Sequence, residues 1–227
     1  MIYLKNNILL FISIFGVFST MLGVKKFLGK EGLIGWIGIA SILANLILVK
    51  SVDLLGISAT LGNVLFASNF LATDMLTECY GYKEAKKGVR FGIFAVLFFM
   101  VVTQIALIFI PNSLDISQSS LELIFGFIPR ISIASVSMFA VSNLVDIRLY
   151  EYLRKKSNGK KMWLRNNVCT IISNGGENFL FYLIAFGGTM PTSTILLMAL
   201  SATIIEIIIA LCDTPFLYIS KMIKSQE

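Results

Sequence analysis

The chain has 227 residues, of which 56% are hydrophobic and 14% charged, and its mean hydropathy is +0.83. The charges lie in short blocks between long apolar runs, a pattern that excludes a soluble globular domain. Several runs approach the roughly 20 residues with which a helix crosses a hydrocarbon layer of about 30 Å. The composition therefore predicts an all-α fold, a polytopic transmembrane helical bundle rather than a β-barrel.

Seven apolar segments are predicted to span the membrane. The first follows Lys5 but lacks the basic start and small-residue cleavage site of a signal peptide, so we expect it to be retained. Residues 1–227 then form a single integral membrane domain, with residues 1–32 as an additional N-terminal span and loop. In chain order the predicted spans are 8–24, 33–49, 54–77, 89–110, 123–145, 168–187 and 192–220.

The charges of the connections alternate along the chain. Sixteen of the nineteen lysines and arginines follow the first, third, fifth and seventh predicted spans. The other connections carry Lys5 and Lys50 as their basic residues, together with Asp53, Asp115 and Glu122. By the positive-inside rule the N-terminus is expected outside and the C-terminus in the cytoplasm. The net charge of +6 is interpreted as this topology signal and not as a nucleic-acid-binding surface.

The residues of common catalytic motifs are missing. The chain has no histidine, no G-x-S-x-G sequence and no glycine-rich phosphate loop with lysine. Cys79, Cys169 and Cys212 form no C-x-x-C pair and are expected to be free, small apolar residues. We therefore expect no enzyme activity, no metal and no cofactor.

Polar side chains inside the predicted spans are the candidate functional residues, because each ionisable group at membrane depth is costly unless it is paired or faces water. Glu177 and Glu206 lie near the centres of their spans, too deep for their carboxylates to reach the interface. With Arg130, also placed within a span, they predict a shared polar cavity. The complete set is Asn69, Thr73, Asp74, Gln104, Arg130, Asn143, Asn174, Glu177, Asn178, Glu206 and Asp213.

Asp74 and Glu78 are one helical turn apart and share a helix face. Glu78 is expected near the cytoplasmic surface, in a structural cluster with Lys86, Lys87 or Arg90. Asp74 is expected about 6 Å deeper, at 1.5 Å per residue, where it lines the cavity or pairs with a buried partner such as Arg130.

Three segments resemble signature blocks of a known family. They are FASNFLATDMLTECYGYKEAKKGV, PRISIASVSMFAVSNLVDIRLYEYLRK and WLRNNVCTIISNGGENFLFYLIAFGG, in this order. The blocks are similar to those of the bacterial queuosine-precursor transporters, earlier labelled a vitamin uptake transporter family, and the resemblance covers roughly residues 33–220. It implies an inner-membrane helical bundle for salvage of 7-deazaguanine bases, used in the tRNA nucleoside queuosine. The family pattern falls on Asp74, Glu78, Arg130, Asp146, Asn174 and Glu177.

The resemblance also marks two departures. Residues 1–32 look like an addition to a six-helix family core. The position of Glu206 can be basic in relatives, so the role of this residue is left open.

A guanine-like base fits the chemistry of these side chains. Its adjacent N–H donors can be accepted by one carboxylate, and an amide or guanidinium can donate to its carbonyl. We expect Glu177 to accept from the base, with help from Asn174 or Asn178. Arg130 is expected to donate to the carbonyl or to hold Asp74 or Asp146, and Glu78 and Asp146 are assigned structural or gating roles. The remaining candidate substrate ligands are Asn69, Asn143 and Glu206, with Phe179, Phe181, Tyr182 and Phe186 as candidate stacking partners.

Two other functions stay open at this point. The chain could be the substrate-binding membrane subunit of an ABC-type vitamin importer, which also needs no nucleotide motif, or a membrane enzyme that holds a metal through acids such as Asp74 and Glu78. The expected partners are a small nucleobase-like substrate and the lipid bilayer, with no nucleic acid. Homo-oligomerisation and the coupling ion are left open.

Overall fold

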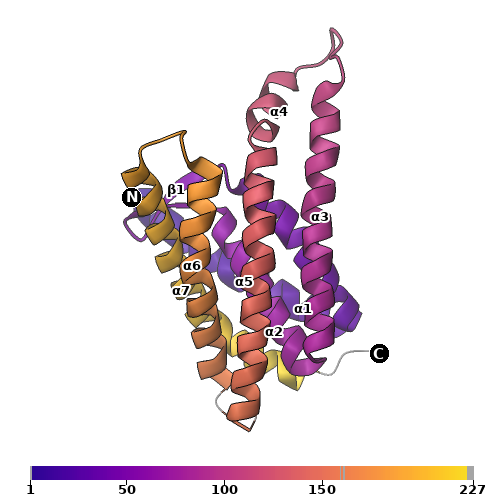
Figure 1. Ribbon diagram of the computed structural model, residues 1–227, viewed down its shortest axis with the longest axis vertical. Helices are drawn as coiled ribbons and strands as arrows, with labels where there is room; N and C mark the ends of the chain where they lie inside the picture. The colour runs from indigo at the N-terminus through magenta and orange to yellow at the C-terminus, as the bar shows by residue number, and fades with distance from the viewer. Residues whose placement is uncertain (1, 159, 161, 224–227) are drawn as a thin grey trace.

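The computed structural model describes residues 2–158, 160 and 162–223, without the side chains of residues 2, 3, 170 and 174. This part of the chain is built of helices apart from one β-hairpin (Figure 1), which confirms the predicted all-α bundle. In chain order the elements are α1 (Ile2–Ile47), β1 (Ser51–Leu54), β2 (Ile57–Thr60), α2 (Gly62–Cys79), α3 (Tyr82–Ile108), α4 (Gln118–Phe125), α5 (Ile128–Lys156), α6 (Met162–Phe186) and α7 (Thr192–Met222).

Helix α1 consists of two helical halves that reverse direction at Gly29. The backbone there has φ 57° and ψ −140°, a conformation that glycine adopts without a Cβ clash. Asn6 Nδ2 donates to the carbonyl of Asp53 at 3.2 Å, and the N–H of Leu55 donates to Asn7 Oδ1 at 2.8 Å. A straight helix would separate such residues by about 60 Å, so the halves must lie antiparallel. The prediction of two helices in this region is confirmed.

The hairpin β1–β2 replaces the predicted start of the third span. Leu54 faces Ile57 across the two strands, and the turn residues Leu55 (φ 53°) and Gly56 (φ 84°) both have positive φ, as in a type I′ turn. The prediction of a span from residue 54 is therefore wrong, since α2 begins at Gly62. Hydropathy did not reveal the turn because apolar side chains continue through it.

Helix α2 lies at the centre of the bundle. Fifteen of its eighteen residues are buried, and it packs against α1, α3, α5 and α7. Two glycines one turn apart let α3 approach closely: a Cβ on Gly88 would lie 2.6 Å from Ile37, and one on Gly92 would lie 2.9 Å from Ile37 and 3.0 Å from Phe139. The polar residues of α2 are thus inside protein and not against lipid.

The outer surface of the bundle is apolar. Large side chains such as Phe94, Phe98 and Ile105 on α3, and Leu197 and Leu211 on α7, are exposed. A water-soluble protein rarely exposes so many, whereas lipid accommodates them. The chain is a multi-pass membrane protein, and the number of seven spans stays a prediction. By length and composition the segments able to cross a membrane are Leu4–Ile47, Tyr82–Ile108, Gln118–Lys156 and Thr192–Met222.

The two ends of the bundle differ in charge. Lys25, Arg154, Arg165 and Lys221 meet at the end where α5 connects to α6, which we call the basic end. The β-hairpin and the connection between α3 and α4 lie toward the opposite end (Figure 1). Four of the basic residues predicted to share one side of the membrane therefore meet at one end of the bundle.

Candidate functional site

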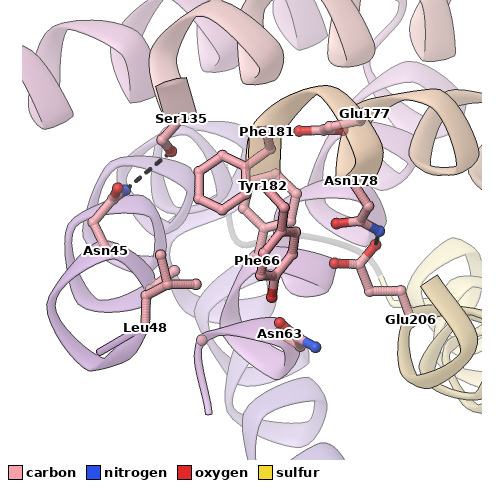
Figure 2. A pocket seen from close by; sticks show the side chains of 12 residues that line it. Asn45, Leu48, Asn63, Phe66, Ser135, Glu177, Asn178, Phe181, Tyr182 and Glu206 are labelled. Atoms are coloured by element: carbon pink, nitrogen blue, oxygen red, sulfur yellow. Dashed lines mark hydrogen bonds between the residues drawn. The ribbon is translucent and has the colours of Figure 1, made fainter. Parts of the chain in front are cut away.

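A pocket in the interior of the bundle collects side chains from α1, α2, α5, α6 and α7 (Figure 2). Its cavity volume is about 30 Å³, so its own side chains nearly fill it. Six lining residues are polar and three are aromatic. The polar ones are Asn45, Asn63, Ser135, Glu177, Asn178 and Glu206, and the aromatic ones are Phe66, Phe181 and Tyr182.

Two acids and an amide form one side of the pocket. Glu206 of α7 is 2% exposed and accepts a hydrogen bond from Asn178 Nδ2 of α6 at 2.7 Å. Glu177, the residue before Asn178, is 6% exposed and lies within hydrogen-bonding reach of Ser142. Its Oε2 has no hydrogen-bond partner among the described residues. A buried acceptor without a partner is costly, so this oxygen is available to a ligand that brings an N–H donor.

Glu177 also borders a second space. From its other side it contributes to a groove between α5 and α6 that is lined by residues such as Val141 and Leu180. The carboxyl group thus lies between the interior pocket and the outer face of these two helices.

Amides from α1 and α2 form the other side of the pocket. Asn45 Nδ2 donates to Ser135 Oγ at 3.2 Å and to the carbonyl of Ser41 at 2.8 Å, while its Oδ1 has no partner in the described part of the chain. Asn63 Oδ1 accepts from Thr60 Oγ1 at 2.9 Å, and its Nδ2 is likewise unpaired there. The pocket therefore offers acceptors and one donor from opposite sides.

Aromatic rings lie between these polar groups (Figure 2). Phe181 and Tyr182 are in edge-to-face contact with centroids 5.3 Å apart, and Tyr182 stacks on Phe186 at 5.7 Å. The hydroxyl of Tyr182 reaches Thr60, which in turn bonds Asn63. Flat rings flanked by polar groups form a surface on which a planar heterocycle can stack.

Three of the predicted substrate ligands come together in this pocket: Glu177, Asn178 and Glu206. Sequence reasoning missed Asn45, Asn63 and Ser135, although the amides stand out within apolar runs. Asn63 was assigned to a span whose start was misplaced, and a lone serine in a helix gives no signal.

Arg130 lies away from this pocket, contrary to its predicted place in a shared polar cavity. It is exposed in the first turn of α5, and its guanidinium donates to the carbonyls of Ile184 (2.9 Å from Nε) and Gly187. The last carbonyls of a helix lack intrahelical partners, and Arg130 supplies donors to them at the end of α6. In the structure it contacts neither the pocket nor Asp74 and Asp146.

Other candidates are buried but do not line the pocket. Asn69 Nδ2 donates to Ser41 Oγ at 3.1 Å, and Asn143 Nδ2 donates to the carbonyl of Phe139 at 3.0 Å. The bond of Asn69 joins α2 to α1, whereas that of Asn143 stays within α5. The side chain of Asn174 lies outside the described residues.

Asp74 and Asp146 lie together in a separate buried cluster with Asp213. Their carboxyl groups are within hydrogen-bonding reach of each other, and Ser173 Oγ donates to Asp146 Oδ1 at 3.1 Å. Asn166 Nδ2 donates to Asp213 Oδ1 at 2.6 Å. None of the three aspartates lines the pocket.

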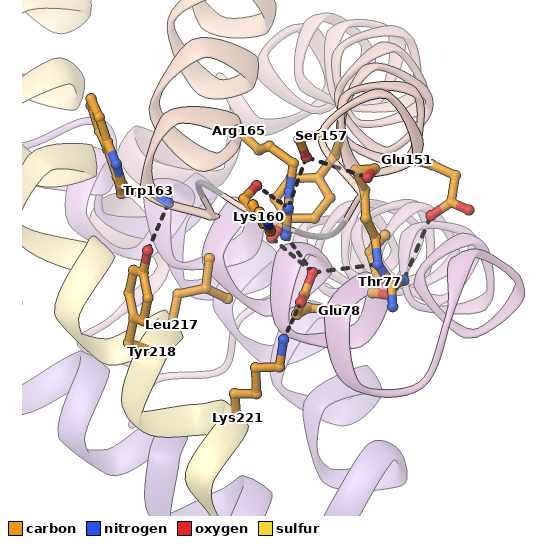
Figure 3. Close-up of polar contacts among 12 residues, drawn as sticks. Thr77, Glu78, Glu151, Ser157, Lys160, Trp163, Arg165, Leu217, Tyr218 and Lys221 are labelled. Carbon is orange, nitrogen blue, oxygen red and sulfur yellow. Dashed lines mark hydrogen bonds and ion pairs between the residues drawn. The ribbon is translucent and has the colours of Figure 1, made fainter.

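Glu78 lies at the basic end, as predicted, but with other partners (Figure 3). Its carboxylate contacts Arg165 at 2.9 Å, Lys221 at 2.8 Å and Arg154 at 3.7 Å, and accepts from Tyr150 at 3.4 Å. The predicted partners on α3 are wrong because the helix of Glu78 turns this side chain toward α5, α6 and α7. The acid therefore ties together four helices at this end.

A larger cavity of about 540 Å³ lies toward the hairpin end. It is lined by the first half of α1, the hairpin and the start of α2, with Asn6 and Lys50 among its few polar residues. Thr60 and Asn63 border it, and Asn63 also lines the interior pocket. This residue separates the two spaces.

The fold and the pocket define a helical membrane protein with a polar binding site buried between its helices, the arrangement found in small-molecule transporters. Residues 60–220 match the family model described as "Putative vitamin uptake transporter". The chain belongs to this transporter family. The family match begins just before α2, so both halves of α1 lie outside it.

Curated relatives carry more specific names. A protein of Bacillus subtilis (strain 168) named "Probable queuosine precursor transporter" is 39% identical over 225 residues, covering 98% of each chain, so this similarity includes α1. The "Queuosine precursor transporter" of Escherichia coli (strain K12) is 24% identical over 63% of this chain and 62% of its own length. A similarly named protein of Haemophilus influenzae is 29% identical over 56% of this chain and 52% of its own. No solved structure matches the chain.

Proposed function

We propose that this chain imports a queuosine precursor, a 7-deazaguanine base, across the bacterial inner membrane. The observation that carries the proposal is the interior pocket, where Glu177 offers an unpaired carboxylate oxygen beside the rings of Phe181 and Tyr182. The family and the names of three relatives point to the same substrate class.

The chemistry of the base matches the pocket. A guanine-like ring presents an N–H and an exocyclic amine side by side, and Glu177 accepts from both. The ring carbonyl lies on the same edge as these donors, so the unpaired Nδ2 of Asn63 on the opposite side is left for a ring-nitrogen acceptor of the base. Phe181 and Tyr182 occupy the middle of the pocket, so their side chains must move aside before they can stack on the faces of the ring (Figure 2).

The route to the pocket runs from the hairpin end. The larger cavity reaches Asn63 and Thr60, and movement of these side chains with Tyr182 would join the two spaces. At the basic end, the contacts of Glu78 with Arg165 and Lys221 close the bundle. In the orientation expected from the positive-inside rule, with the basic end in the cytoplasm, this arrangement corresponds to a state closed toward the cytoplasm.

Restoration of queuosine in tRNA tests the proposal. Cells that can neither synthesise nor import the base are supplied with a precursor and express the wild-type chain or Glu177→Gln. The wild type should restore queuosine, and Glu177→Gln should lower uptake at least tenfold, because the loss of one charge-assisted contact is worth about 1.5 kcal/mol or more.

Glu122→Gln is the matched control, since it removes the same charge from an exposed position of α4. Both variants must be present in the membrane at the wild-type level. If cells that express the wild-type chain still lack queuosine in their tRNA, the proposed function is refuted. Full rescue by Glu177→Gln would refute the assignment of the pocket.

A further inference from the structure

Three aspartates from three helices are buried together, outside the pocket and without a cationic partner. Asp74 (α2) and Asp146 (α5) are 0% exposed and Asp213 (α7) is 2% exposed. No ion pair joins any of them to lysine or arginine within residues 2–158, 160 and 162–223, because Arg165 pairs with Glu78 instead. Ionised carboxylates in such a position are strongly unfavourable, so a neutralising ligand is required.

The hydrogen bonds of this aspartate cluster are incomplete in one particular way. Both oxygens of Asp74, Oδ2 of Asp146 and Oδ1 of Asn166 have no partner among the described residues, and all four are acceptors. Asp74 and Asp146 are nevertheless within hydrogen-bonding reach of each other. Two carboxylates cannot bond without a proton, whereas one protonated carboxyl donates to the other. The missing ligand is therefore a donor, and a proton meets the need.

The other titratable groups near Asp74 do not remove this requirement. Arg165, the cation that also faces Tyr150 and Cys169, is engaged by Glu78 at 2.9 Å. The remaining groups carry no positive charge, and the chain has no histidine. These groups are Glu78 on the same helix, Asp146 and Tyr150 from α5, Cys169 from α6 and Asp213 from α7.

The arrangement suits a proton better than a metal cation. Within the described residues, no three acidic or cysteine side chains are placed so that they could hold one ion. A metal ion needs several converging oxygen ligands, whereas a shared proton needs only the two carboxyl groups that face each other.

A chain of polar groups links the aspartate cluster to the pocket. Ser173 Oγ donates to Asp146 Oδ1, and the carbonyl of Ser173 accepts from Ser142 Oγ at 3.2 Å. Ser142 in turn reaches Glu177, which lines the pocket. Protonation of the aspartates thus acts on the same helices, α5 and α6, that position the substrate ligand.

We propose that Asp74 and Asp146 form a proton-binding site that takes up and releases one proton per transport cycle and so couples substrate import to the proton gradient. The proposal rests on the transport function proposed above. The shared proton holds α2 against α5. Its release leaves two negative charges that repel each other, which favours separation of these helices.

The test uses the purified full-length chain in proteoliposomes, with the aminomethyl 7-deazaguanine base as labelled substrate. An inward pH gradient of one unit should raise wild-type accumulation up to about tenfold for one proton per substrate, since one pH unit is a tenfold difference in proton activity. Substrate addition should also acidify the vesicle interior, reported by a trapped pH dye. A protonophore should abolish the accumulation.

Removing the charge of Asp74 or Asp146 should separate coupling from transport. Asp74→Asn and Asp146→Asn should lose the tenfold response to the gradient and the proton movement, yet keep substrate counterflow, which needs no gradient. Asp53→Asn, an exposed aspartate of the hairpin, is the matched control and should behave as the wild type. Infrared spectra of the purified protein test the site without substrate. The wild type should show a band from a protonated carboxyl group, and this band should be weaker in both variants.

The outcomes separate the two proposals. Wild-type counterflow without a gradient response or proton movement would overturn the proton site and leave the transport function standing. The proton site would also be overturned if a sodium gradient, and not the pH gradient, raised substrate accumulation. Full coupling in the Asp74→Asn variant would overturn it as well. If counterflow is absent from the wild type, the transport function fails, and the carboxyl band then decides on the proton site alone. Variants that do not fold leave the wild-type proton movement and this band as the decisive measurements.

Discussion

Replacing Glu78 by glutamine removes the charge that holds the basic end of the bundle together. The carboxylate lies 2.9 Å from Arg165, and both side chains are only 2% exposed. Lys221 is at 2.8 Å but 57% exposed, and Arg154 is at 3.7 Å and 35% exposed. The effect should therefore come mainly from the buried contact with Arg165.

The magnitude follows from this difference in burial. Removing one partner of a buried ion pair costs about 3–5 kcal/mol because the other charge stays buried without compensation. The exposed partners add about 0–1 kcal/mol each. Arg165 keeps hydrogen bonds to the carbonyl of Lys160 (2.8 Å) and to Ser157 (3.3 Å), which favours the lower end of the range, about 3 kcal/mol.

Equilibrium unfolding of the purified protein in mixed detergent micelles measures this loss. Glu84→Gln is the matched control. Glu84 pairs with Lys87 at 2.8 Å, but the side chain of Lys87 is 61% exposed. The unfolding midpoint of the Glu84→Gln protein should therefore stay at the wild-type value. A Glu78→Gln protein that loses less than about 1 kcal/mol, or no more than the control, would refute the reasoning from burial. The double variant Glu78→Gln/Arg165→Met should recover part of the stability, because it removes the uncompensated charge.

Two further predictions concern packing and selectivity. Gly92→Leu should lower the free energy of unfolding by about 1–3 kcal/mol, because its Cβ would meet Phe139 at 3.0 Å. Gly35→Leu is the control, since a Cβ there meets nothing within 4 Å. Equal losses of stability in the two variants would contradict the close packing of α3. Glu206→Gln should reduce the preference for the aminomethyl over the nitrile precursor about tenfold, because one charged contact to the amine is lost. Competition uptake with both precursors measures it, and an unchanged preference would remove Glu206 from substrate recognition.

The primary structure determined that this protein is a helical membrane bundle and which of its ends carries the positive charge. Both follow from local chemistry, because apolar runs of membrane length and blocks of lysine and arginine act where they stand in the chain. Glu177, Asn178 and Glu206 were found in the same way, since polar residues deep in apolar helices need a compensating environment wherever the helices pack.

Only the tertiary structure decided which polar residues meet. In the sequence, Asp74 and Asp146 are 72 positions apart and are as polar as Glu177. In the structure they lie in their own cluster, whereas Glu177 lines the pocket. Arg130 was expected among the acids and instead supplies donors to the last carbonyls of α6. Such outcomes depend on helix rotation and tilt, which arise from contacts between residues far apart along the chain and leave no trace in local composition.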